Sequence, residues 1–166
     1  MDVFGQHKRA IRELLAKPPF GYRNIPDNDL ELFASALVHD SYSNEAGNLR
    51  NNERLEFLGD AVLEFVACEH IYRNTDLTEG GMTGLKQEIV RNRNISEAVT
   101  AYGIELDEIL LVGGGHINPM TKRPMVNENM RADAFEALLA AIYLTYGMED
   151  VRKIVQEVLV ARQLRI

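Results

Sequence analysis

The stretch that most limits what this chain can fold into is residues 51–63, Asn-Asn-Glu-Arg-Leu-Glu-Phe-Leu-Gly-Asp-Ala-Val-Leu. They have the apolar spacing of a helix, and Glu56 and Asp60 lie four residues apart, on one helical face. Two neighbouring anions on such a helix repel each other and resist burial. Because a divalent cation would remove both difficulties, the stretch is consistent with a helix that carries part of a metal site.

Residues 133–144 repeat this design. Asp133 and Glu136 are three residues apart, and every residue from Ala134 to Leu144 except Glu136 is apolar or aromatic, which is typical of a central helix. No Lys or Arg lies between residues 132 and 151 to neutralise Glu136. Two such helices could build the all-oxygen site that Mg²⁺ prefers. A carboxylate pair is usually only a solvated helix face, so the pattern by itself leaves both interpretations open.

Four segments resemble the ribonuclease III family, in the family's order. Glu53–Leu63 resembles the signature of the family, and Ala132–Leu138 resembles its other catalytic segment. His39-Asp40-Ser41-Tyr42 is similar to a His-x-Ser-Tyr element that precedes the signature, and Glu79–Lys86 to a Glu-Gly-x-Leu-Ser-x-Leu-Arg/Lys element that follows it. The resemblance covers about residues 20–160.

The resemblance implies an all-α fold, that of the ribonuclease III endonuclease domain, as a single domain over residues 1–166. It also implies a metal-dependent endoribonuclease that hydrolyses phosphodiester bonds in double-stranded RNA during RNA processing, ribosomal RNA included. The family acts as a homodimer in which each subunit cuts one strand. The expected products carry 5′-phosphate and 3′-hydroxyl ends with a short 3′ overhang.

The same resemblance assigns roles to acidic residues. Glu56, Asp60, Asp133 and Glu136 are the expected ligands of Mg²⁺, for which Mn²⁺ can substitute, and Asp60 and Glu136 are the expected catalytic pair. Such a cation neutralises the phosphate, lowers the pKa of a bound water and stabilises the leaving 3′ oxygen. Two further acidic positions, Glu53 and Glu79, are expected to support the active valley. No small-molecule organic cofactor is expected.

The net charge of −7, from 18 basic and 25 acidic residues, fits poorly with an RNA partner, because phosphate binding usually needs a basic face. A bound cation would weaken this objection. The basic residues are also clustered, although exposed Lys and Arg often serve only solubility. The candidate RNA contacts are Asn52, Lys86, Arg91, Arg93, Lys122 and Arg123.

Apolar periodicity and the placement of Pro, Gly and Asn predict helices throughout, with no convincing strand. The expected helices cover about residues 6–17, a segment that begins after Asp27-Asn28 as N-cap residues, and residues 53–73, 84–92, 95–102, 105–111, 128–146 and 149–163. A Gly-rich turn is expected over residues 79–84 and an exposed loop over residues 113–124.

Composition agrees with a cytoplasmic protein that does not associate with membranes. Apolar residues make up 46% of the chain, and the longest fully apolar run, Ala137–Leu144, is far too short to span a bilayer. The N-terminus lacks the apolar core of a signal peptide. The single cysteine, Cys68, excludes an internal disulfide framework, and its place in an apolar helical pattern predicts that it is buried.

Two departures from the family stand out. The usual C-terminal double-stranded RNA-binding domain is not recognisable, so weak RNA affinity is expected. Gly113-Gly114-Gly115-His116 occupies the place where many relatives carry Gly-x-Gly-Glu, and no role is assigned to His116.

Three other classes of protein are alternatives to this enzyme. A non-catalytic RNA-binding or assembly module of the same fold is the main alternative, although such a module would gain nothing from four carboxylates that face phosphate. A di-iron bundle needs Glu-x-x-His pairs. The residues three before the histidines are Phe4, Ala36, Ala67 and Gly113, which excludes that class. An all-helical scaffold without an active site is the simplest alternative.

Overall fold

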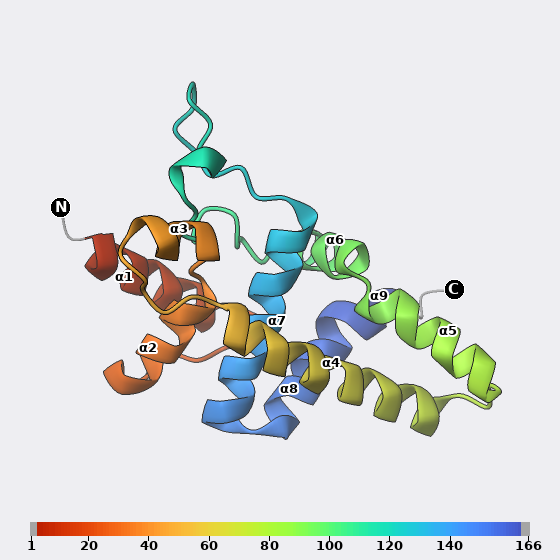
Figure 1. The fold of residues 1–166 in the computed structure, drawn as a ribbon. Helices are drawn as coiled ribbons and strands as arrows, with labels where there is room; N and C mark the ends of the chain where they lie inside the picture. The colour runs from red at the N-terminus through yellow and green to blue at the C-terminus, as the bar shows by residue number, and fades with distance from the viewer. Residues whose placement is uncertain (1–2, 164–166) are drawn as a thin grey trace.

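The computed structural model describes residues 3–163, in which the regular structure is helical (Figure 1). The helices are α1 (Val3–Ala16), α2 (Asp27–Ala36), α3 (Asp40–Glu45), α4 (Glu53–Asn74), α5 (Glu79–Val90), α6 (Asn92–Tyr102), α7 (Glu128–Tyr146), α8 (Met148–Val155) and α9 (Ala161–Gln163). Short 3-10 and π-helical turns occupy Gly114–His116 and Gln156–Val160. Isolated bridges pair Val38 with Leu111 and Ile117 with Pro124. The all-α prediction is confirmed.

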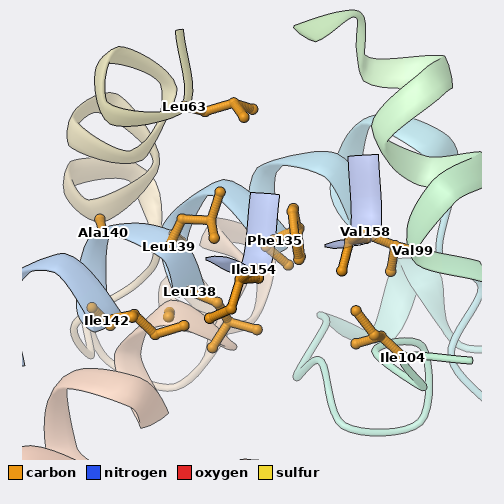
Figure 2. Packing of buried hydrophobic residues seen from close by; sticks show 14 of the residues in the cluster. Leu63, Val99, Ile104, Phe135, Leu138, Leu139, Ala140, Ile142, Ile154 and Val158 are labelled. Carbon is orange, nitrogen blue, oxygen red and sulfur yellow. The ribbon is translucent and has the colours of Figure 1, made fainter. Parts of the chain in front are cut away.

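Helix α7 lies at the centre of the fold. It packs against α4, α6, α2 and α8, and each residue from Ala134 to Ile142 is buried. Figure 2 shows Leu138 and Leu139 of α7 among apolar side chains from the surrounding helices. A helix apolar on nearly all sides is stable in water only when it is covered in this way. Neither α7 nor any other described helix has the length and apolar character that crossing a bilayer requires.

Helix α4 crosses α7 and has two unlike faces. Leu63 is fully buried against the core, whereas Phe57 is 83% exposed and Phe65 is 51% exposed on the other face. Cys68 belongs to the exposed face. The prediction that Cys68 is buried is therefore wrong, because α4 carries apolar residues on both faces and only one of them is covered within the chain.

The N-terminal half of the chain differs from the predicted boundaries in two places. Helix α3 was not expected; its N-cap is His39, whose Nδ1 accepts a hydrogen bond from the backbone N–H of Ser41. Helix α2 begins at Asp27 itself, after Pro26, so Asp27 lies in the first turn rather than at the cap. Acidic residues are favourable there too, because they face the positive end of the helix dipole.

Two segments after α4 also differ. Residues 79–84, expected to be a turn, form the first half of α5, because the Thr78 side chain accepts the N–H of Gly81 and caps the helix. Residues 105–111, expected to be a helix, form turns instead. The N–H of Leu110 still donates to the carbonyl of Leu106, as in a helix. The helix does not continue, and Leu111 exchanges backbone hydrogen bonds with the segment after α2, donating to Leu37 and accepting from His39.

Candidate metal centre

Three carboxylates converge where α4 crosses α7. Glu56 of α4 and Asp133 and Glu136 of α7 each offer an oxygen, and these atoms all lie within 4.8 Å of one another. In an octahedral Mg²⁺ site the oxygens stand about 2.1 Å from the ion, so opposite ligands lie about 4.2 Å apart. The spacing therefore fits a hard divalent cation after small side-chain adjustments.

Gly59 allows this convergence. A Cβ added at Gly59 would lie 1.8 Å from the carbonyl oxygen of Glu136 and 2.4 Å from its carbonyl carbon. Real Cβ atoms do not approach backbone so closely, and only a hydrogen fits between the two helices at this point. The glycine therefore brings the backbone of α4 directly against the residue of α7 that carries the central carboxylate.

Glu136 is the most deeply placed of the three carboxylates, with 4% of its surface exposed. No hydrogen bond or ion pair to its side chain is present within residues 3–163. Burial, followed by the charges of Asp60, Asp133 and Glu56, raises its pKa to about 8. A buried carboxylate of this kind must either bind a proton or be neutralised by a cation.

The neighbouring carboxylates show the same shortage of positive charge. Partial burial raises the pKa of Glu56, and Asp133, Glu53 and Asp60 raise it further. Burial also raises the pKa of Asp133, against the opposing effect of a positive charge on His39. The cluster as a whole therefore favours the binding of a proton or a cation.

The other predicted acidic residues lie outside this cluster. Asp60 is exposed on the next turn of α4, close enough for its charge to act on Glu136 but not grouped with the three ligand atoms. Glu53 is exposed at the start of α4 and accepts a hydrogen bond from the Asn51 amide at 3.0 Å. Glu79 is exposed at the start of α5 and accepts one from the Thr83 hydroxyl at 3.3 Å.

Asn52 differs from the other expected RNA contacts, because its side chain is only 2% exposed. Its backbone N–H donates to Val38, which fixes the entry into α4 against the core. Its side-chain nitrogen has no hydrogen-bond partner in the described part of the chain. Four residues before Glu56, Asn52 lies on the carboxylate side of α4 rather than on the outer surface.

Most of the expected basic contacts pair with acidic neighbours. Lys86 binds Glu64 of α4. Further pairs join Arg91 to Glu88, Arg93 to Glu97 and, at 3.9 Å, Arg123 to Glu108. Exposed ion pairs of this kind contribute little to stability, but they leave less free positive charge for phosphate. Lys122, exposed at a φ of 59°, has no ion pair within the described residues.

His39 is a site neighbour to which the sequence interpretation assigned no role, although its His-x-Ser-Tyr motif had been recognised. Its Nδ1 lies 2.7 Å from the Ser41 hydroxyl. Its ring meets the ring of His116 edge-on at 5.6 Å, and its charge acts on Asp133. His39 thus connects α3 and the loop after residue 112 with the carboxylate cluster.

The helical fold and the carboxylate cluster define a ribonuclease-III-like nuclease domain. The Ribonuclease-III-like family model matches residues 29–163, and the chain belongs to this family. It is 41% identical over 135 residues to Ribonuclease 3 of Caldanaerobacter subterraneus subsp. tengcongensis, covering 80% of this chain and 57% of the relative. It is 43% identical over 125 residues to Ribonuclease 3 of Pseudomonas fluorescens, covering 75% of this chain and 50% of the relative. The chain thus spans about half the length of these curated relatives.

Solved structures support the fold. The nuclease domain of ribonuclease III from Campylobacter jejuni aligns over 100% of this chain and 99% of its own, with a TM-score of 0.69 and 24% identity. A second structure of that domain, described as flexible in a region involved in dimer formation, aligns over 97% of this chain and 98% of its own, with a TM-score of 0.69 and 25% identity.

Proposed function

We propose that this protein is a metal-dependent endoribonuclease that hydrolyses phosphodiester bonds in double-stranded RNA and acts in RNA processing in the cytoplasm. The observation that carries the proposal is the buried carboxylate of Glu136, which has no cationic partner among the described residues and lies within 4.8 Å of two further carboxylates. The naming of its curated relatives as Ribonuclease 3 gives further support.

In this proposal Glu56, Asp133 and Glu136 hold the cation, Mg²⁺ or, as a substitute, Mn²⁺. When bound, the cation neutralises phosphate charge and activates water, which gives products with 5′-phosphate and 3′-hydroxyl ends. Glu136 orients the centre from its buried position. Asp60, exposed beside it, supplies a fourth carboxylate from the solvent side, where a phosphate arrives.

RNA is held by backbone contacts from the surface around the cluster. Duplex RNA is recognised mainly through its shape, phosphates and 2′-hydroxyls. Among the predicted basic contacts, Lys122 is the most available, because it has no ion pair within residues 3–163. Arg123, Lys86, Arg91 and Arg93 contribute when their acidic partners release them. Asn52 is too deeply buried for this role.

A homodimer completes the proposed enzyme. Phe57, Ala61, Phe65, Cys68 and Tyr72 form a continuous exposed stripe along α4, each three or four residues from the next. Leu58 of the same helix lines, together with Leu144, a hollow of about 500 Å³. Exposed apolar surface of this extent is typical of interfaces. A second copy covering it would give two centres, one for each strand of the duplex, with Glu53 and Glu79 in the valley between them.

The alternative is a module of the same fold that binds RNA without cutting it. Such a module would have to hold phosphate beside several anions, one of which, Glu136, is buried with no cationic partner between residues 3 and 163. Its stability and its RNA affinity would both improve if the cluster were lost. The retention of the cluster therefore favours the enzyme.

The test is cleavage of a perfectly paired RNA duplex in the presence of Mg²⁺, with analysis of the product ends. Cleavage that leaves 5′-phosphates, stops on chelation of the metal and falls at least about 10³-fold in Glu136→Gln would support the proposal, since a ligand of the catalytic cation is worth several kcal/mol. Near-normal turnover of Glu136→Gln at saturating Mg²⁺ would remove Glu136 from the site.

A further inference from the structure

Helix α3 contacts the beginning of the loop of residues 113–124, which projects above α3 in Figure 1. The proposed function assigns no role to α3. Its first turn begins at His39, whose charge acts on Asp133. Its last residue, Glu45, reaches the beginning of the loop.

The contact between Glu45 and the loop is specific. Both carboxylate oxygens of Glu45 accept the backbone N–H of Gly114, at 3.0 and 2.9 Å. The N–H of Gly113 donates to the Ser41 hydroxyl at 2.9 Å. Hydrogen bonds to an ionised acceptor are roughly twice as strong as neutral ones. Two consecutive loop amides are therefore held by one face of α3.

The loop is also closely fitted at this point. A Cβ added at Gly113 would lie 2.6 Å from a carboxylate oxygen of Glu45 and 2.8 Å from the carbonyl oxygen of Ser41. A larger residue at this position would push the loop away from α3. Gly113, which matches the first glycine of the family's Gly-x-Gly-Glu element, thus allows the loop to lie directly against Glu45.

Beyond its anchor, the loop has an ordered shape. The bridge between Ile117 and Pro124 closes it as a small hairpin. The Asn118 side chain accepts the backbone N–H groups of Met120 and Thr121, at 2.9 and 3.0 Å. Because the hairpin is organised internally, its direction relative to the cluster depends on how its base is held.

We propose that Glu45 is a positioning residue that fixes the hairpin relative to the metal centre, so that Lys122 and Arg123 meet the RNA backbone while a phosphate lies at the carboxylates. The inference rests on the proposed function. It assigns to an acidic residue a favourable effect on the binding of an anionic substrate.

The direction in which Glu45 affects RNA binding distinguishes a positioning role from a purely electrostatic one. In a chain of net charge −7, an exposed carboxylate near a phosphate-binding loop should weaken binding, and its removal should strengthen it. If Glu45 holds the loop in place, its removal should weaken binding instead. The two effects predict opposite changes in KM.

The experiment compares Glu45→Ala and Glu45→Gln with Glu105→Ala, a charge-matched control at an exposed position after α6. We expect Glu45→Ala to raise KM for duplex RNA about tenfold while kcat changes less than about twofold, as for the loss of one hydrogen bond to a charged group. Glu45→Gln should give an intermediate KM, because its amide oxygen still accepts the Gly114 N–H. Glu105→Ala should leave KM unchanged or lower it.

Amide hydrogen exchange of Gly114 in the RNA-free protein tests the anchor independently of catalysis. Exchange should be about tenfold faster in Glu45→Ala than in the wild type or in Glu105→Ala. An unchanged exchange rate, or a KM in Glu45→Ala at or below the wild-type value, would overturn the proposal. A wild-type protein that cuts no duplex RNA would refute the proposed function, while the exchange rate would still decide whether Glu45 holds the loop.

Discussion

Gly59 of α4 touches the backbone of Glu136 of α7 so closely that a Cβ would lie 1.8 Å from the Glu136 carbonyl oxygen. Gly59→Ala should therefore force the helices apart and lower the free energy of unfolding by at least about 3 kcal/mol, the upper range for overpacked cores. Urea unfolding measures this loss. Gly84→Ala is the matched control, because a Cβ added at Gly84 would meet no atom of residues 3–163 within 4 Å beyond its own stretch of helix. In a helix, Ala is favoured over Gly by up to about 1 kcal/mol. Equal stabilities for the two variants would contradict the close approach.

The pKa of Glu136 gives the metal-free protein an unusual dependence on pH. The pKa is raised from 4.5 in an ordinary glutamate to about 8 in the fold, so the protonated form is favoured by folding. The stability that this group contributes is fully present below about pH 4.5 and is lost as pH rises to about 8. Chemical unfolding in EDTA at several pH values measures the loss. In Glu136→Gln the decline should be much smaller, and an identical decline would exclude Glu136 as its cause.

Divalent cations should stabilise the folded protein against heat. A ligand that binds only the folded form adds RT ln(1 + [L]/Kd), or about 2.7 kcal/mol at one hundred times Kd. Thermal melts with Mg²⁺, Mn²⁺ and Ca²⁺ should all show a raised Tm. Ca²⁺ should support cleavage poorly, because its coordination shell is larger and less rigid. A Tm that does not respond to any of the three ions at millimolar concentration would contradict the site.

Charged substitutions at Phe57 and Leu63 should separate the proposed interface from the core. Phe57 is 83% exposed and Leu63 is fully buried. Phe57→Glu should leave the fold intact and convert the dimer to monomer in sedimentation. Leu63→Glu should cost several kcal/mol of folding stability, since it buries an unpaired charge. A wild-type protein that sediments as a monomer at micromolar concentration and still makes paired cuts would refute the dimer.

Replacing Lys122 and Arg123 with Ala should raise KM more than it lowers kcat. In the proposed complex these residues contact the RNA backbone at phosphates other than the scissile one. Each lost phosphate contact should flatten the plot of log affinity against log salt by about one unit or less. Lys122 should contribute more than Arg123, which is near Glu108 at 3.9 Å. An unchanged salt slope in the double variant would show that the hairpin does not touch RNA and would direct attention to Lys86, Arg91 and Arg93.

The sequence by itself determined the helical class, the two central helices and the residues of interest. Apolar periodicity identified α4 and α7 with boundaries close to those observed, because each helix is long and its pattern strong. The family resemblance singled out Glu56, Asp60, Asp133 and Glu136, three of which lie together in the structure. The absence of a local basic partner for Glu136 could also be read directly from the sequence.

Only the tertiary structure decided which faces are covered and which side chains meet. It placed three carboxylates together and left Asp60 outside, buried Asn52, exposed Cys68 and joined Glu45 to Gly114 across 69 positions of the chain. It also gave residues 105–111 a path of turns that ends where Leu111 pairs with the segment after α2. The physical reason is that helical periodicity specifies which residues share a face, whereas the burial, charge and contacts of that face depend on distant parts of the chain that pack against it.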